Sequence, residues 1–133
     1  METSVQQVIE NCSQGSYAGI LSFGENVGAL MGAGVESYQA DYRARTTTYY
    51  MPDGATSVLP LKAPADAIPE HFDAAALQQA IRGAQRGEVK YPEFLQLSRA
   101  AGCVGYMVWI AGRHVAYMGR RGDIHVEHFP ASK

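Results

Sequence analysis

The fold is decided by residues 101–129, which read AGCVGYMVWIAGRHVAYMGRRGDIHVEHF. Three short runs rich in Val, Ile, Tyr and Trp are separated there by Gly112-Arg113 and Arg121-Gly122. Runs of this kind joined by tight turns are typical of antiparallel β-hairpins. The stretch therefore predicts a three-stranded meander.

The two faces of this meander are predicted to differ. With two central residues in each turn, Val108 faces Tyr117 and Tyr117 faces Val126. Successive side chains of a strand point to opposite faces, so one face is apolar and is expected to pack on the core. That face would carry Val104, Tyr106, Val108, Ile110, Val115, Tyr117, Ile124 and Val126. The other would mix apolar and ionisable groups, namely Met107, Trp109, His114, Ala116, Met118, His125, Glu127 and Phe129.

The same unit occurs upstream, displaced by 68 residues without a gap. Identical residues at this offset lie at turns and at core positions. They include Gly19 and Gly87, Gly34 and Gly102, Tyr38 and Tyr106, Arg45 and Arg113, Tyr49 and Tyr117, Gly54 and Gly122, and Val58 and Val126. A gapless match across helix, turn and strand indicates duplication, the alternative being two convergent helix-then-hairpin units.

Each copy is predicted to begin with two helices. Ser22 and Glu25 form a capping box, Asp73 is a good N-cap, and Gly15 is expected to end the first helix. Strands are expected at 35–42, 46–51 and 55–59. The prediction is an α+β fold in which helices pack on one face of an antiparallel sheet with pseudo-two-fold symmetry. It divides a single domain, 1–133, into repeat 1 at about 3–59, a Pro-rich linker at about 60–72 and repeat 2 at about 73–129.

Length, net charge and hydrophobic content limit the classes of protein to which the chain can belong. A chain of 133 residues with net charge −2 and 47% hydrophobic residues is expected to be one soluble domain without a nucleic-acid-binding surface. No apolar run is long enough for a membrane span or an export signal, so a cytoplasmic location and no membrane partner are expected.

No metal or cofactor is predicted. Residues 86–94 resemble the second half of an EF-hand loop, but Arg82 and Arg86 would occupy ligand positions and repel calcium. In a strand, His125 and Glu127 share a face whereas His128 points away from it. The two cysteines form neither a disulfide framework nor a zinc site, and Cys103 is expected to be a small buried side chain.

The candidate site is the mixed face together with its counterpart in the first copy, Ser37, Gln39, Asp41, Thr46, Thr48, Tyr50 and Ser57. Trp109 could instead lie in a second small core beneath the linker. The binding residues predicted there are Asp41, Tyr50, Met107, Trp109, Met118, His125 and Glu127. At the turns, Arg45, Arg113 and Arg120 would attract an anionic partner or remain solvated loop charges.

Several of these motifs resemble a known family. Gly112-Arg113, Tyr117, Gly119-Arg120, Gly122, His125-Val126-Glu127 and Phe129-Pro130, with Asp41-Tyr42, Thr47-Thr48-Tyr49-Tyr50 and the 87–94 segment, resemble YbcV-like bacterial and prophage proteins. That family, often labelled "phage envelope protein", has no accepted activity. The resemblance implies a small bacterial protein, and it supplies no catalytic residue.

The leading hypothesis is a binding or protein-interaction module that uses one sheet face, with a protein partner or a small ligand, and that forms a homo-oligomer such as a homodimer. The alternative is a small enzyme in which His125 is a general base oriented by Glu127, with Asp41 and tyrosines shaping the pocket. A third reading is a phage-borne inhibitor that binds a host protein through its Arg-tipped turns. An enzyme is the less favoured reading.

Overall fold

Two helices followed by three strands occur twice along the chain, as predicted. The computed structural model describes residues 1–63 and 66–129, so residues 64 and 65 of the predicted linker and Pro130 lie outside it. The first unit consists of α1 (Thr3–Tyr17), α2 (Phe23–Gly32), β1 (Ser37–Asp41), β2 (Thr46–Tyr50) and β3 (Thr56–Pro60). The second consists of α3 (Ala74–Gln85), α4 (Tyr91–Ala100), β4 (Cys103–Trp109), β5 (His114–Gly119) and β6 (Ile124–His128).

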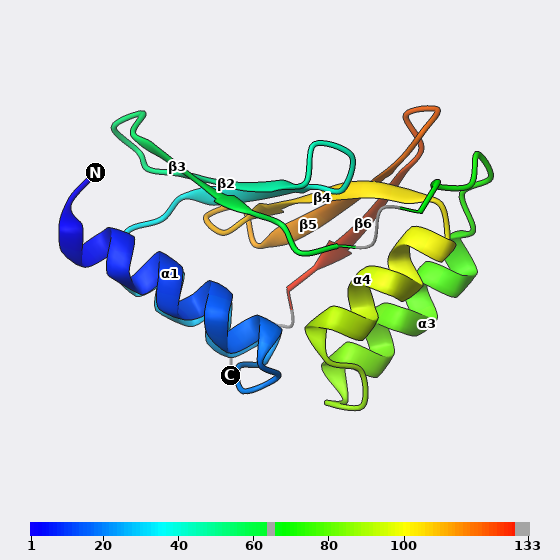
Figure 1. Ribbon diagram of the computed structural model, residues 1–133, viewed down its shortest axis with the longest axis horizontal. Coiled ribbons are helices and arrows are strands. Elements are labelled where there is room, and N and C mark those ends of the chain that lie inside the picture. The colour runs from blue at the N-terminus through cyan, green and yellow to red at the C-terminus, as the bar shows by residue number, and fades with distance from the viewer. Residues whose placement is uncertain (64–65, 130–133) are drawn as a thin grey trace.

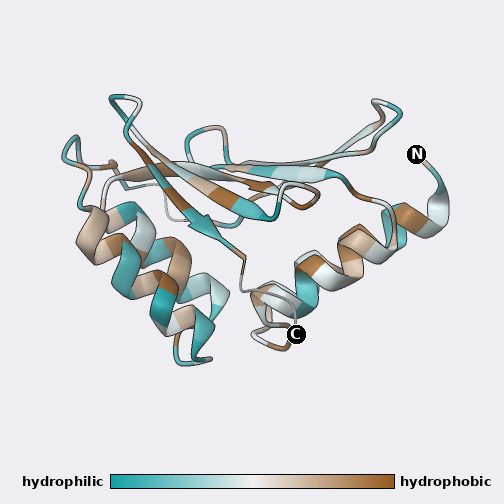
Figure 2. Ribbon diagram, turned by 180° about the vertical axis from the view of Figure 1, so that it is seen from behind, coloured by the Kyte–Doolittle hydropathy of each residue, from teal (hydrophilic) through white to brown (hydrophobic). Residues whose placement is uncertain are grey.

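All six strands form one antiparallel sheet in the order β3-β2-β1-β4-β5-β6. The two meanders meet at β1 and β4, where Ser37 pairs with Trp109 and Asp41 with Gly105. The helices lie on one side of this sheet in both views of the molecule (Figures 1 and 2). The predicted α+β architecture is therefore confirmed, with the two repeats arranged about the β1–β4 pair.

The backbone repeats at the same 68-residue offset as the sequence. Eight residues with positive φ form four pairs with similar angles, which shows that these matching positions have matching turn geometry. These pairs are Gly19 (72°) and Gly87 (76°), Gly34 (88°) and Gly102 (92°), Arg45 (61°) and Arg113 (59°), and Gly54 (91°) and Gly122 (81°).

Helices α2 and α3 begin where capping chemistry predicts. Ser22 forms the expected capping box with Glu25, and the Asp73 side chain accepts the amide of Ala76. The first helix, however, continues through Gly15 to Tyr17. A Cβ on Gly15 would lie 2.7 Å from the Leu21 side chain, so this glycine allows close packing and does not end the helix.

The core lies between the helices and the sheet. Its fully buried side chains include Ile9, Leu30, Leu77, Leu95 and Val108. Tyr42 is also fully buried, and its hydroxyl is 2.8 Å from Ser98 Oγ on α4. Buried linker residues close the same core, namely Leu61, Ala63 and Ile68.

Hairpin length explains a wrong face assignment in β6. The β4–β5 loop has four residues, which moves the pairing by two positions from the predicted register and preserves the faces, with Val108 opposite Val115. The β5–β6 loop is Arg120-Arg121-Gly122, one residue longer than predicted, so Tyr117 pairs with His125. A one-residue shift turns every side chain of a strand to the other face.

The one-residue shift exchanges the two faces of β6. Ile124 and Val126, predicted to be core residues, lie on the face away from the helices and are 64% and 44% exposed. His125 and Glu127 lie on the helix-facing side. Ser57 in the first copy, predicted on the same outer face, likewise points toward the helices, where its hydroxyl contacts Gln6 of α1.

Candidate functional site

A cleft lies between the two helical hairpins, on the helix-facing side of the sheet. The α1–α2 and α3–α4 pairs lie apart next to the strands and approach each other at the end of α1 and the start of α4 (Figure 1), where the Tyr17 and Tyr91 ring centroids are 5.3 Å apart. The cleft has a volume of about 550 Å³. Small-molecule sites in proteins typically measure roughly 300–1,000 Å³. This cavity is therefore large enough for a ligand.

Tyrosines from the four inner strands form the floor of the cleft. Tyr38 and Tyr49 stack with their ring centroids 5.3 Å apart, and Tyr106 and Tyr117 lie 5.7 Å apart. These are equivalent positions of the two repeats, so the aromatic floor is nearly symmetric. Apolar side chains from both hairpins form the walls: Tyr17, Ile20, Leu21 and Phe23 on one side, and Val89, Tyr91 and Phe94 on the other.

The tyrosine hydroxyls are linked by hydrogen bonds. The Tyr91 and Tyr106 hydroxyls are 2.7 Å apart, and Asn26 Nδ2 donates to the Tyr38 hydroxyl at 3.2 Å. Burial raises the pKa of Tyr38, Tyr91 and Tyr106 above the ordinary value, so all three remain protonated near neutral pH. The cleft thus offers neutral hydroxyls that can donate or accept a hydrogen bond.

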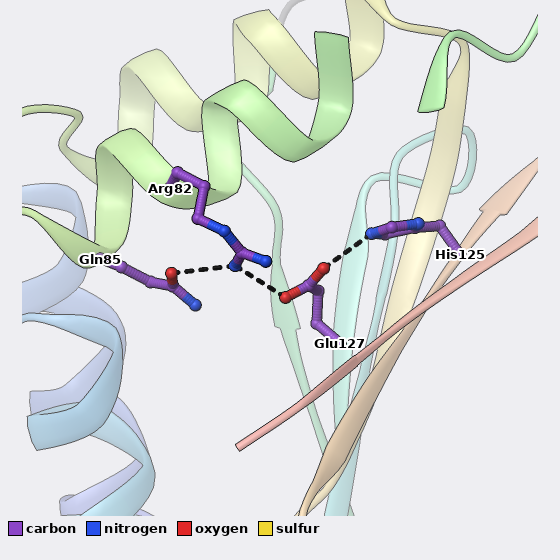
Figure 3. Close-up of polar contacts among 4 residues, drawn as sticks. All are labelled: Arg82, Gln85, His125 and Glu127. Atoms are coloured by element: carbon purple, nitrogen blue, oxygen red, sulfur yellow. Dashed lines mark hydrogen bonds and ion pairs between the residues drawn. The ribbon is translucent and has the colours of Figure 1, made fainter. Parts of the chain in front are cut away.

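An ionic network lies where β6 passes α3 (Figure 3). Arg82 Nη1 donates to Glu127 Oε1 at 2.8 Å and to Gln85 Oε1 at 3.0 Å. The other carboxylate oxygen of Glu127 is 2.9 Å from His125 Nε2. Because an ionised carboxylate only accepts, His125 donates here from Nε2. The network joins the edge strand to the helix, and both Glu127 and Gln85 line the cleft.

The electrostatics of Glu127 follow from its two partners. Burial on its own would raise the pKa of this carboxyl. The hydrogen bonds and charges of Arg82 and His125 outweigh burial and lower the pKa below its ordinary value of 4.5. Glu127 is therefore ionised at neutral pH, with both oxygens engaged.

Five of the predicted site residues do share a face. Asp41, Tyr50, Met107, Trp109 and Met118 all point away from the helices. With 43% of its surface exposed, Trp109 is not part of a second core beneath the linker. His125 and Glu127 lie on the opposite face, so their predicted grouping with Trp109 is wrong.

Asp41 likewise does not join His125. Its Oδ1 accepts the amides of Arg43 and Ala44, both at 3.0 Å, and so closes the β1–β2 turn. The sheet separates the two side chains, and a pocket that combines Asp41 with His125 is excluded.

The turn arginines contact the chain itself. Arg45 Nη2 donates to the Ala63 carbonyl at 2.9 Å, and Arg120 Nη1 to the Ile68 carbonyl at 3.1 Å. Both therefore hold the linker against the end of the sheet. The Arg113 guanidinium lies 5.7 Å from the centre of the Phe129 ring. Attraction of an anionic partner by these three residues stays a prediction.

The cleft residues were expected in the sequence as core residues. Tyr38, Tyr49, Tyr106 and Tyr117 have core spacing, and all four are indeed mostly buried. The sequence signal for the cleft was that these core positions carry tyrosine and not leucine or valine. A hydroxyl in a core needs a hydrogen-bond partner.

Both cysteines are free and buried. Burial raises the pKa of the Cys103 thiol to about 11, as expected for a small buried side chain. Within residues 1–63 and 66–129, no three His, Cys, Asp or Glu side chains lie close enough together to hold a metal ion. None of the helices in this part of the chain has the length and apolar character needed to cross a membrane.

Comparison with known proteins places the chain in a family without assigning an activity. No curated protein matches it. Residues 22–128 match the model of a family described as "Protein of unknown function (DUF1398)". The match covers both sheet halves and the helices α2, α3 and α4. The chain therefore belongs to the DUF1398 family of proteins of unknown function.

Proposed function

We propose that this protein is a binding module that takes a small, mainly apolar molecule into the cleft between its helical hairpins. The observation that carries this proposal is the cavity of about 550 Å³ floored by Tyr38, Tyr49, Tyr106 and Tyr117. Binding sites for small molecules are typically concave and apolar, with few polar groups that orient the ligand.

The lining indicates the chemistry of the ligand. Aromatic faces favour a planar ring, because offset-stacked and edge-on ring contacts are stabilising. The Tyr91–Tyr106 hydroxyl pair and the Asn26 amide can orient one or two polar substituents. Two carboxylates of the lining are already engaged: Glu127 is paired with Arg82 and His125, and Glu25 accepts the Ser22 amide in its capping box. A neutral aromatic compound with a hydroxyl or carbonyl group fits these conditions best.

A blocking substitution tests the proposal. Ser16 of α1 lines the cleft, whereas Gln14 on the same helix is exposed and does not. With N-phenyl-1-naphthylamine as a neutral fluorescent probe, we expect saturable binding by the wild type. Ser16→Trp should weaken it at least about tenfold, the equivalent of 1.4 kcal/mol, and Gln14→Trp should leave it unchanged. Equal affinities of the two variants, or no saturable binding, would contradict the proposal.

A general-base enzyme is the second candidate, favoured by the 2.9 Å contact between His125 Nε2 and Glu127. In the neutral ring this contact leaves the lone pair on Nδ1, so Nδ1 would be the base. Asp41 has no part in this version. His125 does not itself line the cleft, so the base would act on a ligand that extends past Glu127. His125→Asn should then abolish turnover of that ligand while its affinity remains. Absence of turnover in the wild type would contradict the enzyme hypothesis and leave only the binding module.

The cellular location and the bacterial or prophage type of protein also belong to the proposal, and neither implies an activity. A cytoplasmic bacterial or prophage protein of the YbcV-like type is consistent with a small ligand-binding domain. The "phage envelope" label adds nothing to the chemistry of the cleft.

A further inference from the structure

The face of the sheet opposite the helices has an unusual composition, and we call it the outer face. No helix of the described residues covers it (Figure 2). The strand pairing assigns to it Ser37, Gln39, Asp41, Thr46, Thr48, Tyr50, Thr56, Val58, Pro60, Met107, Trp109, His114, Ala116, Met118, Ile124, Val126 and His128. None of these strand residues is Lys or Arg, and the one carboxylate, Asp41, is engaged in a turn.

Apolar groups gather on one half of this face. Trp109, Ile124 and Val126 are 43%, 64% and 44% exposed, and Met107 and Met118 lie beside them on β4 and β5. The other half, on β1–β3, is rich in hydroxyl groups and carries one large exposed apolar residue, Val58. Interface cores are depleted in charge and enriched in aromatic residues and Met, and the β4–β6 half has this composition.

We propose that two copies of this chain associate through their outer faces, with β4–β6 of one copy packed on β4–β6 of the other. This inference goes beyond the proposed cleft function and does not depend on it. A two-fold axis running across the strands places each half of the outer face over the same half of the partner. Apolar residues then meet apolar residues, and no Lys or Arg of the strands faces another one across the interface.

The size of the face is compatible with such a dimer. Six strands about 4.8 Å apart, each about five residues of 3.3 Å, span roughly 480 Å² per copy. Two copies would bury roughly 1,000 Å², the lower limit of specific interfaces, so a dimer of moderate affinity is expected.

Sedimentation velocity from about 2 to about 200 µM, a range that brackets a micromolar Kd, tests this proposal. The wild type should pass from monomer to dimer. Trp109, the only tryptophan, should shift its emission to shorter wavelength over the same range because it leaves water. Val126→Lys, or Ile124→Lys if the first variant does not fold by circular dichroism, should raise the Kd at least about tenfold. The matched control is Met31→Lys, at a 58% exposed position of α2, which should not change the Kd.

Three results would overturn the proposal. The first is a wild type that remains monomeric throughout the range, including one that binds a different protein. The second is a dimer whose Trp109 emission does not change with concentration. The third is equal weakening by Val126→Lys and Met31→Lys.

Discussion

The two halves of the molecule attach their edge strands to the helices in different ways. In the first half, the Ser57 hydroxyl of β3 donates to Gln6 Oε1 of α1 at 2.7 Å. In the second half, Glu127 of β6 pairs with Arg82 of α3 and with His125. At the 68-residue offset, Ser57 corresponds to His125 and Leu59 to Glu127. The same backbone position thus carries an uncharged hydrogen bond in one copy and a titratable network in the other.

This difference shows which constraints the architecture imposes and which it leaves open. Turn glycines and floor tyrosines are the same in both halves because backbone conformation and core packing need them. The contact between edge strand and helix needs only complementary partners, so its chemistry can differ between the halves. The Arg82–Glu127–His125 network beside the cleft consequently belongs to the second half.

The largest expected effect concerns the glycines that end the second helix of each half. Gly34 and Gly102 both have φ near 90°. A Cβ on Gly102 would lie 2.1 Å from the His71 carbonyl oxygen. A Cβ on Gly34 would meet the Met51 methyl at 3.5 Å, an ordinary van der Waals contact. Gly34→Ala should cost about 1–2 kcal/mol from its backbone angle, and Gly102→Ala about 3 kcal/mol or more. Urea unfolding measures the loss of stability in both variants. Equal losses would show that the linker backbone at His71 moves aside at no cost in free energy.

The edge-strand contacts should differ less strongly. Glu127→Ala leaves Arg82 and His125 without their shared acceptor and should cost about 2 kcal/mol, because hydrogen bonds to charged groups are the stronger kind. Ser57→Ala removes one neutral bond and should cost about 1 kcal/mol. Chemical denaturation of the two variants provides the comparison, and a larger loss for Ser57→Ala would reverse the order proposed for the two contacts.

The two contacts should also respond differently to pH. The pKa of Glu127 is below 4.5 in the folded state, so its stabilisation is complete above about pH 4.5 and is lost as the pH falls through the lowered value. The stability difference between wild type and Glu127→Gln should therefore shrink in acid. The difference between wild type and Ser57→Ala should stay constant. Unfolding free energies measured from pH 7 to about pH 3 test this, and a constant Glu127→Gln difference would speak against an ionic contact.

The smallest effect is expected at Val58 and Val126, equivalent positions that are 57% and 44% exposed on the outer face. Val→Thr at either position should change the unfolding free energy of the monomer by less than about 0.5 kcal/mol, the usual range for surface substitutions. Thermal unfolding at low protein concentration is the measurement. A clear loss of unfolding free energy at Val126 alone would mean that other residues of the same chain cover the outer face at β6.

Much of the fold could be predicted from local patterns. The capping box at Ser22, the N-cap at Asp73 and the alternation in β4 and β5 each depend on neighbouring residues, and each prediction was confirmed. The 68-residue offset also predicted the matching turns. The face of β6 was wrong because a loop of two and a loop of three residues are both compatible with Arg-Arg-Gly, and one added residue inverts the strand.

The candidate site was far less accessible from the chain alone. Periodicity distinguishes a buried face from an exposed one, so it placed Tyr106 and Tyr117 against the helices but not beside a cavity. How two helical hairpins meet over a sheet depends on packing between residues distant in sequence, such as Tyr17 and Tyr91. Arg82 and Glu127, 45 residues apart, meet for the same reason. Local pattern therefore set the elements, their repetition and the turn residues, whereas long-range packing created the cleft and its ionic neighbour, because neither exists until the helices lie on the sheet.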